Sequence, residues 1–146
     1  MKTQILKIKI WLLIAIYKRI HGYTKPSTKA LYAQAYHETG DFNSKVFKEN
    51  NNLFGMRQPK RRKTLATGSN LNHATFKNHR NSIIDYFLRQ KEFNIPNEVD
   101  SVYISKTVKS NYAEDPNYES KWLNIIATIK NPLGIAYALT AVSFFF

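Results

Sequence analysis

Apolar residues recur at helical spacing along most of this chain, and this periodicity limits the folds open to it. From Trp122 to Ile129, four apolar residues stand at positions i, i+3, i+4 and i+7. Residues 82–93 carry a similar stripe. Residues 53–80 differ, because they hold turn formers, a basic cluster and only short apolar pieces. The sequence therefore predicts a mainly α fold (α+β) with one small irregular β-hairpin.

Caps and breakers place the ends of these helices. Ser27 or Thr28 can cap a helix that runs to about Thr39, and Gly40 follows as a natural stop. Asp115 is expected to cap a last helix with Pro116 in its first position. Further helices are expected at residues 4–20, 44–50 and 82–93. Residues 101–110 fit helix or strand, because they are rich in β-branched side chains.

The composition excludes several kinds of site. The chain has 146 residues, which predicts one domain, and it has no cysteine. Disulfides, thiolate metal sites and a cysteine nucleophile are therefore excluded. The four histidines show no spacing that suits metal ligands, and no glycine-rich phosphate loop is present. We accordingly expect no metal and no cofactor.

The charge balance is strongly basic. Lysines and arginines number 22 against 10 acidic residues, which gives a net charge of +12. Such a charge favours polyanionic partners such as nucleic acid, anionic lipid or the bacterial envelope. Residues 57–63 (RQPKRRK) concentrate it, although a solvated loop tip explains them equally well. No recognition helix, finger or RNA-binding signature is present, so no specific nucleic acid is expected.

Both termini are apolar. Residues 10–17 (IWLLIAIY) form an uninterrupted run, but it is short and no small-residue cleavage site follows it. We interpret it as a buried first helix rather than a signal or an anchor. Residues 132–146 are almost wholly apolar but shorter than the ~20 residues that a helical span needs. A helix packed on the core is expected there, with membrane contact by the apolar termini as the alternative.

Glu38 stands out among the few acids by its position. It falls at the end of the helix predicted before Gly40, beside Tyr36 and His37. The partial negative charge of a helix C-terminus disfavours a carboxylate, and apolar walls disfavour it further. Both effects raise the pKa, as a general acid requires near neutral pH. A solvated glutamate at a helix end remains the alternative on chemistry alone.

Three segments in order resemble a known family. Residues 30–57 (ALYAQAYHETGDFNSKVFKENNNLFGMR) resemble the opening of the glucosaminidase family, the lysozyme-like cell-wall hydrolases of glycoside hydrolase family 73. Residues 112–118 (YAEDPNY) resemble that family's YATDPxY segment, and residues 74–76 and 82–88 resemble the strand and helix between the two. The resemblance implies a lysozyme-like domain whose hairpin flanks a glycan cleft. It divides the chain into an N-terminal helix (1–25), a family-like core (26–130) and an apolar tail (131–146).

The resemblance also implies roles for particular residues. Glu38 would protonate the glycosidic oxygen, and Tyr112 would line the cleft near the reacting sugar. Further contacts with the glycan are expected from Asn52, Phe54, Tyr118 and His37. Core packing is the alternative for the aromatic residues, and it is favoured for Phe54 and Tyr118.

The second carboxylate that glycosidases usually need is harder to place. Residues 58–81 contain six basic residues and no acid. Asp41, three residues after Glu38, is one candidate for this catalytic role. Asp85 is the other, although it is expected on a helix surface where Arg89 at i+4 can pair with it. Assistance by the substrate's own N-acetyl group would need neither.

The sequence thus predicts a peptidoglycan hydrolase that cleaves the β-1,4 bond between N-acetylglucosamine and N-acetylmuramic acid. Its partner is bacterial peptidoglycan, and it is expected to act at the cell wall. Its place would be a phage virion, a phage-infected cell (as an endolysin) or the secreted fraction. Two alternatives stay open: a catalytically inactive lysozyme-like module that binds glycan or builds a virion, and a basic nucleic-acid-binding protein.

Overall fold

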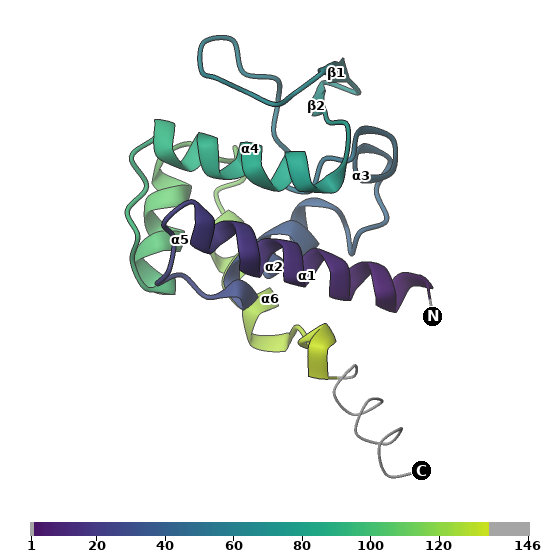
Figure 1. The fold of residues 1–146 in the computed structure, drawn as a ribbon. Coiled ribbons are helices and arrows are strands. Elements are labelled where there is room, and N and C mark those ends of the chain that lie inside the picture. Colours follow the sequence, from purple (N-terminus) through teal and green to yellow (C-terminus); the bar gives the residue numbers. More distant parts are fainter. Residues whose placement is uncertain (1, 135–146) are drawn as a thin grey trace.

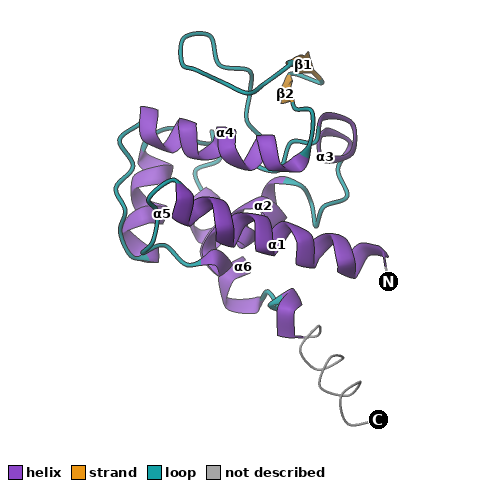
Figure 2. Ribbon diagram, viewed as in Figure 1, coloured by secondary structure: helices purple, strands orange, loops and turns teal. Residues whose placement is uncertain are grey.

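Helices packed around α2 form the body of the molecule, and a short β-hairpin stands at one end (Figures 1 and 2). The computed structural model describes residues 2–134. The elements in chain order are α1 (Lys2–Ile20), α2 (Thr28–Glu38), α3 (Lys45–Asn50), β1 (Gly68–Asn70), β2 (His73–Thr75), α4 (His79–Glu92), α5 (Asp100–Lys109) and α6 (Tyr118–Thr128). The predicted mainly α fold with a small hairpin is confirmed.

Helix α2 lies at the centre because its small residues allow close packing. Ala30, Ala33 and Ala35 are fully buried, and α2 contacts both α1 and α6. The indole nitrogen of Trp122 in α6 donates a hydrogen bond to the Ala30 carbonyl at 2.8 Å. Ser27 caps α2 through the backbone N–H of Ala30, as the sequence predicts. Helix α2 is therefore held by packing on two sides.

Helix α1 is buried on one face only. Ile10 and Ile14 are fully buried against α2 and α4, whereas Leu12 is 43% exposed and Ile16 is 52% exposed. The expectation of a buried helix is thus half correct, because residues two apart on a helix lie on nearly opposite faces. Among the described residues, no helix has the length and the apolar content to cross a membrane.

The hairpin is short and side chains hold the backbone around it. Strands β1 and β2 pair antiparallel with Gly68 opposite Thr75, and Leu71 and Asn72 form the turn at φ of 55° and 58°. The amide of Asn50 donates hydrogen bonds to the carbonyls of Asn70 and His73. The two strands span three residues each, and the rest of the predicted hairpin region is loop and turn up to His79, where α4 begins.

Three elements were ambiguous or begin elsewhere than predicted. Helix α4 begins at His79, three residues before the expected start at Ser82, because Asn78 caps it through the backbone N–H of Asn81. Residues 100–109 form a helix, with Tyr103 and Thr107 buried one turn apart. Helix α6 begins at Tyr118, two residues after the expected start at Pro116. The Asp115 carboxylate accepts the backbone N–H of Asn117 at 2.8 Å, so it forms a turn before the helix rather than its cap. The apolar tail predicted to pack on the core lies outside the described residues from position 135 on.

Candidate active site

Glu38, the last residue of α2, opens onto a cleft of about 550 Å³. The cleft is walled by the turn after α3, the basic loop that follows (residues 57–67), the end of α4 and the segment between α5 and α6. The lining includes one glycine, three arginines, a tyrosine and a glutamate: Gly55, Arg57, Arg62, Arg89, Tyr112 and Glu114. A second hollow of about 360 Å³ lies between α1, α2 and α6, and its described lining carries no carboxyl group. The cleft at Glu38 is therefore the candidate active site.

Burial makes Glu38 a weak acid. Loss of hydration raises the pKa of its carboxyl group from 4.5 to about 7, because the charged form is disfavoured in the enclosed wall. The Tyr118 hydroxyl opposes part of this rise in pKa, because it can donate to the charged carboxylate. Glu38 therefore holds a substantial protonated fraction at neutral pH, as a general acid must.

Gly55 makes room for the Glu38 carboxyl. Its φ is +66°, a left-handed conformation that side chains disfavour. A Cβ at this position would overlap Glu38 Oε2 and would lie 3.2 Å from Cδ. Glycine is thus required at position 55, in the turn after α3 (NLFG, residues 52–55), for two reasons: the left-handed backbone and the Glu38 carboxyl group that lies against it.

Asn52 and Phe54 build this turn from within. The Asn52 amide donates to the carbonyls of Met56 at 2.8 Å and Ala74 at 2.9 Å, and its oxygen accepts the N–H of Phe54. The Phe54 ring is buried and stacks on Tyr86 with 4.0 Å between centroids. Neither side chain lines the cleft, whereas Gly55 and Met56 do. The structure thus gives both predicted glycan contacts a supporting position.

The two predicted tyrosines lie together at the cleft. Tyr112 lines it and donates a hydrogen bond from its hydroxyl to the Phe54 carbonyl at 2.6 Å. Tyr118 stacks behind Tyr112 with 6.0 Å between ring centroids and is 2% exposed. Its hydroxyl accepts from the Gln34 amide at 3.1 Å, so it lies between the protein interior and Glu38. Tyr112 is placed to contact a ligand, and Tyr118 to support the acid.

Asp41 and His37 lie near Glu38 in sequence but do not line the cleft. Asp41 forms an ion pair with Lys7 of α1 at 2.9 Å. The His37 ring packs edge-on against Tyr118 with 5.4 Å between centroids. Helix α2 ends at Glu38 and the chain then turns through Gly40, so neighbours along the sequence point in different directions.

Asp85 corrects the expectation of a surface carboxylate that pairs with Arg89. It is fully buried and forms an ion pair at 2.7 Å with Arg62, whose side chain is only 8% exposed. It also accepts the Thr64 hydroxyl at 2.7 Å and the Leu65 backbone N–H at 2.8 Å. These three donors come from the basic loop, which folds over α4 and binds the Asp85 carboxylate there. Asp85 therefore anchors the loop.

Sequence reasoning missed several residues of the cleft. Arg57, Arg62, Arg89, His73 and Glu114 line it. Glu114 had a signal, because it stands in YAEDPNY where the resembled segment has threonine. No signal in the sequence marked Arg89 as a cleft residue, since a cation in an amphipathic helix normally lies on the solvent-exposed face.

The fold and this cleft define a lysozyme-like helical domain with an enclosed glutamic acid. The glucosaminidase family profile, described as mannosyl-glycoprotein endo-beta-N-acetylglucosaminidase, matches residues 15–131. The chain therefore belongs to the glucosaminidase family of glycoside hydrolases. This membership confirms the resemblance that the sequence carries and supports hydrolysis of peptidoglycan.

A solved structure has the same fold. It is described as a type VI secretion system effector-immunity complex from Pseudomonas protegens. The two chains superpose with a TM-score of 0.68 at 16% identity, over 86% of this chain and 89% of the other. At that identity the likeness shows the fold alone. No curated protein matches the chain in sequence, and the predicted phage origin is not shown by any of these comparisons.

Proposed function

We propose that this protein hydrolyses the β-1,4 bond between N-acetylglucosamine and N-acetylmuramic acid in peptidoglycan, with Glu38 as the general acid. The observation that carries the proposal is a glutamic acid with a pKa of about 7 in the wall of a cleft. Membership of the glucosaminidase family supports the reaction class. A basic chain also suits the anionic cell wall, where it is proposed to act.

The proposed first step breaks the glycosidic bond. Glu38 gives its proton to the glycosidic oxygen, and the bond between that oxygen and C1 of N-acetylglucosamine breaks. The acetamido oxygen of the same sugar bonds to C1 and takes up the developing positive charge. Glu38, now a carboxylate, then accepts a proton from water, whose oxygen attacks C1 and opens the ring formed by the acetamido group. The second step restores the acid.

Substrate assistance is favoured by where the carboxylates lie. Asp41 is paired with Lys7 outside the cleft, and Asp85 is held by Arg62 and two further donors. Glu114 is the other carboxylate among the described cleft residues, and it is exposed on the segment between α5 and α6. The N-acetyl group needs no enzyme nucleophile, so Glu38 and the substrate suffice for the chemistry.

Zymography on purified peptidoglycan tests the proposal. Wild type should clear the gel and Glu38→Gln should not, because glutamine keeps the shape but its amide is too weak an acid to protonate the glycosidic oxygen. Asp41→Asn is the matched control, since it removes a carboxylate three residues away that lies outside the cleft. The control should clear like wild type. Failure of folded wild type to clear would instead support a catalytically inactive glycan-binding module.

The bond itself is identified from the new reducing ends. Digests reduced with borohydride should yield fragments that end in N-acetylglucosaminitol, as measured by mass spectrometry. Fragments that end in N-acetylmuramitol would show cleavage of the other glycosidic bond and would contradict the proposed specificity. In the zymography, loss of clearing in both single variants, Asp41→Asn and Glu38→Gln, would make Asp41 a catalytic residue after all.

A further inference from the structure

Arg89 is a buried cation in the cleft that no described carboxylate neutralises. It is 7% exposed, and the ion pairs of residues 2–134 do not include it. Burying an unpaired charge is costly, so such groups normally have an ionic partner. The Asp85 carboxylate one turn earlier on α4 is taken by Arg62. Arg89 therefore lacks the partner that its burial calls for.

The protein fixes the Arg89 guanidinium with neutral groups. It donates to the Gln90 side-chain oxygen at 2.9 Å and to the Ser110 carbonyl at 3.2 Å. Its Cζ lies 4.1 Å from the ring centroid of Phe93 and 4.6 Å from that of Tyr112. Both rings line the cleft with it. The aromatic faces hold the group in place without cancelling its charge.

Donors of Arg89 remain for a ligand. A guanidinium has five N–H donors, and the protein uses two of them. Its Nε donates no hydrogen bond within residues 2–134, and no buried side-chain nitrogen there lacks a partner, so Nε reaches solvent. The cleft is the space that Arg89 lines. Arg57 lines the same cleft and adds positive charge, whereas Arg62, which also lines it, is neutralised by Asp85. The fork geometry of a free guanidinium edge suits a planar carboxylate.

We propose that Arg89 anchors a subsite for a carboxylate carried by the glycan strand. This inference rests on the proposed function, because it places an acidic glycan in the cleft beside Glu38. Two sources on peptidoglycan offer the same chemistry: the lactyl group of N-acetylmuramic acid where the peptide has been removed, and the acidic residues of the stem peptide. An acidic strand supplies the negative charge that would pair with Arg89, whereas a neutral chitin strand does not.

Binding is best measured without turnover, in the full chain that carries Glu38→Gln. The ligands are stem-bearing glycan fragments, stem-free fragments with free lactyl groups, and chitin oligosaccharides of equal length. Adding Arg89→Gln should weaken binding of at least one acidic ligand by about 10- to 100-fold, which is the usual effect of losing a hydrogen bond between charged groups. Binding of the chitin oligosaccharide should change less than about threefold. The acidic ligand that responds identifies the source of the carboxylate.

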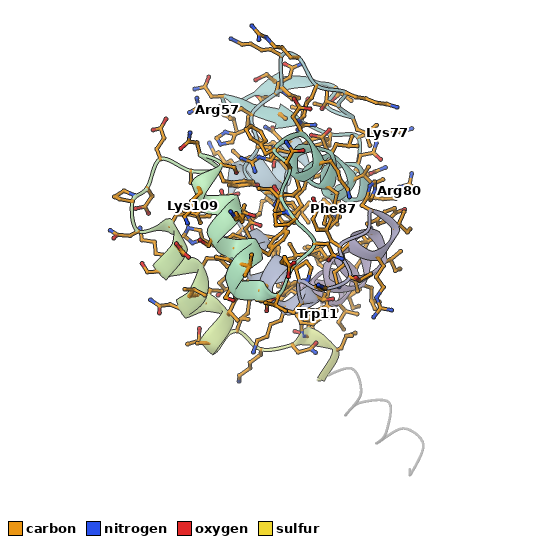
Figure 3. The ribbon with its side chains drawn as sticks, turned by 90° about the vertical axis from the view of Figure 1, so that its left-hand side faces the viewer. Trp11, Arg57, Lys77, Arg80, Phe87 and Lys109 are labelled. Atoms are coloured by element: carbon orange, nitrogen blue, oxygen red, sulfur yellow. The ribbon has the colours of Figure 1, made fainter. Side chains whose placement is uncertain are left out.

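Arg80→Gln is the matched charge control. Arg80 is exposed at the start of the same helix, and Figure 3 shows it across the molecule from Arg57. This variant should bind all three ligands like its parent. Equal loss of acidic and neutral ligands in Arg89→Gln would show a purely structural role and overturn the subsite, as would no loss at all. Arg89→Lys should fall between parent and glutamine, because it keeps the charge and loses the fork.

A second measurement covers the case in which Arg89→Gln does not fold. Sodium acetate should raise the melting temperature of the wild-type chain above that in sodium chloride of equal ionic strength, since a ligand of the native state stabilises it. No difference between the two salts in wild type overturns the subsite without any variant. Arg89-dependent binding by a protein that clears no peptidoglycan would leave the subsite standing and refute the hydrolase.

Discussion

Replacing Gly55 by alanine tests whether the turn after α3 positions the acid. The new Cβ would overlap Glu38 Oε2 and lie 3.2 Å from Cδ, so the carboxyl group must move away. A displacement of about 1 Å at a catalytic group costs on the order of 100-fold in rate. We therefore expect kcat to fall by about 100-fold with little change in KM, because the distal walls of the cleft keep their places.

The same substitution also strains the backbone, and this effect must be separated from the first. At a φ of +66°, alanine costs about 1 kcal/mol relative to glycine. In a chain of this size that lowers the melting temperature by about 2 to 4 °C. Gly22→Ala provides the control, since Gly22 has a φ of +84° and its added Cβ would meet only Lys91 Nζ at 3.5 Å. It should show a similar thermal loss and full activity.

Initial rates of clearing of a peptidoglycan suspension, taken over a range of substrate concentrations, measure the effect. Thermal unfolding of both variants supplies the structural comparison. Retention of more than half of the wild-type kcat by Gly55→Ala, with the same thermal loss as Gly22→Ala, would refute the reasoning. In that outcome the Glu38 carboxyl would not need the place in which the structure holds it.

Further predictions concern the charged groups. Because burial raises the pKa of Glu38 to about 7, activity should fall as pH rises above 7, as a pH–rate profile would show. The folded state binds this proton more tightly than the unfolded state, so stability should fall from pH 4.5 to 7 by up to about 3 kcal/mol; thermal unfolding of Glu38→Gln should lack this fall. Asp85→Ala leaves Arg62 buried without its partner and should lose about 3–5 kcal/mol in denaturant unfolding; a loss below about 1 kcal/mol would contradict its anchoring role. Glu114→Gln should keep kcat within about tenfold if the substrate assists itself, whereas a loss near 10⁴-fold would make Glu114 the base.

Much of the fold follows from local pattern. Ser27 and Gly40 bracket α2 in the sequence as they do in the structure, with one residue of difference at its end. The ambiguous segment 101–110 became a helix because its apolar side chains meet α6, a contact that propensity does not contain. The start of α6 shifted to Tyr118 because Asp115 satisfies a turn instead of a helix end.

The sequence by itself determined the helical periodicity, the short hairpin and the position of Glu38 before a glycine, because each depends on neighbours a few residues apart. Only the tertiary structure decided where the other charges point. Asp41 forms an ion pair with Lys7 and Asp85 with Arg62, whereas Arg89 lines the cleft without an ion pair among residues 2–134. A periodic pattern defines the faces of a helix relative to one another, but which segment packs on each face depends on contacts distant in sequence.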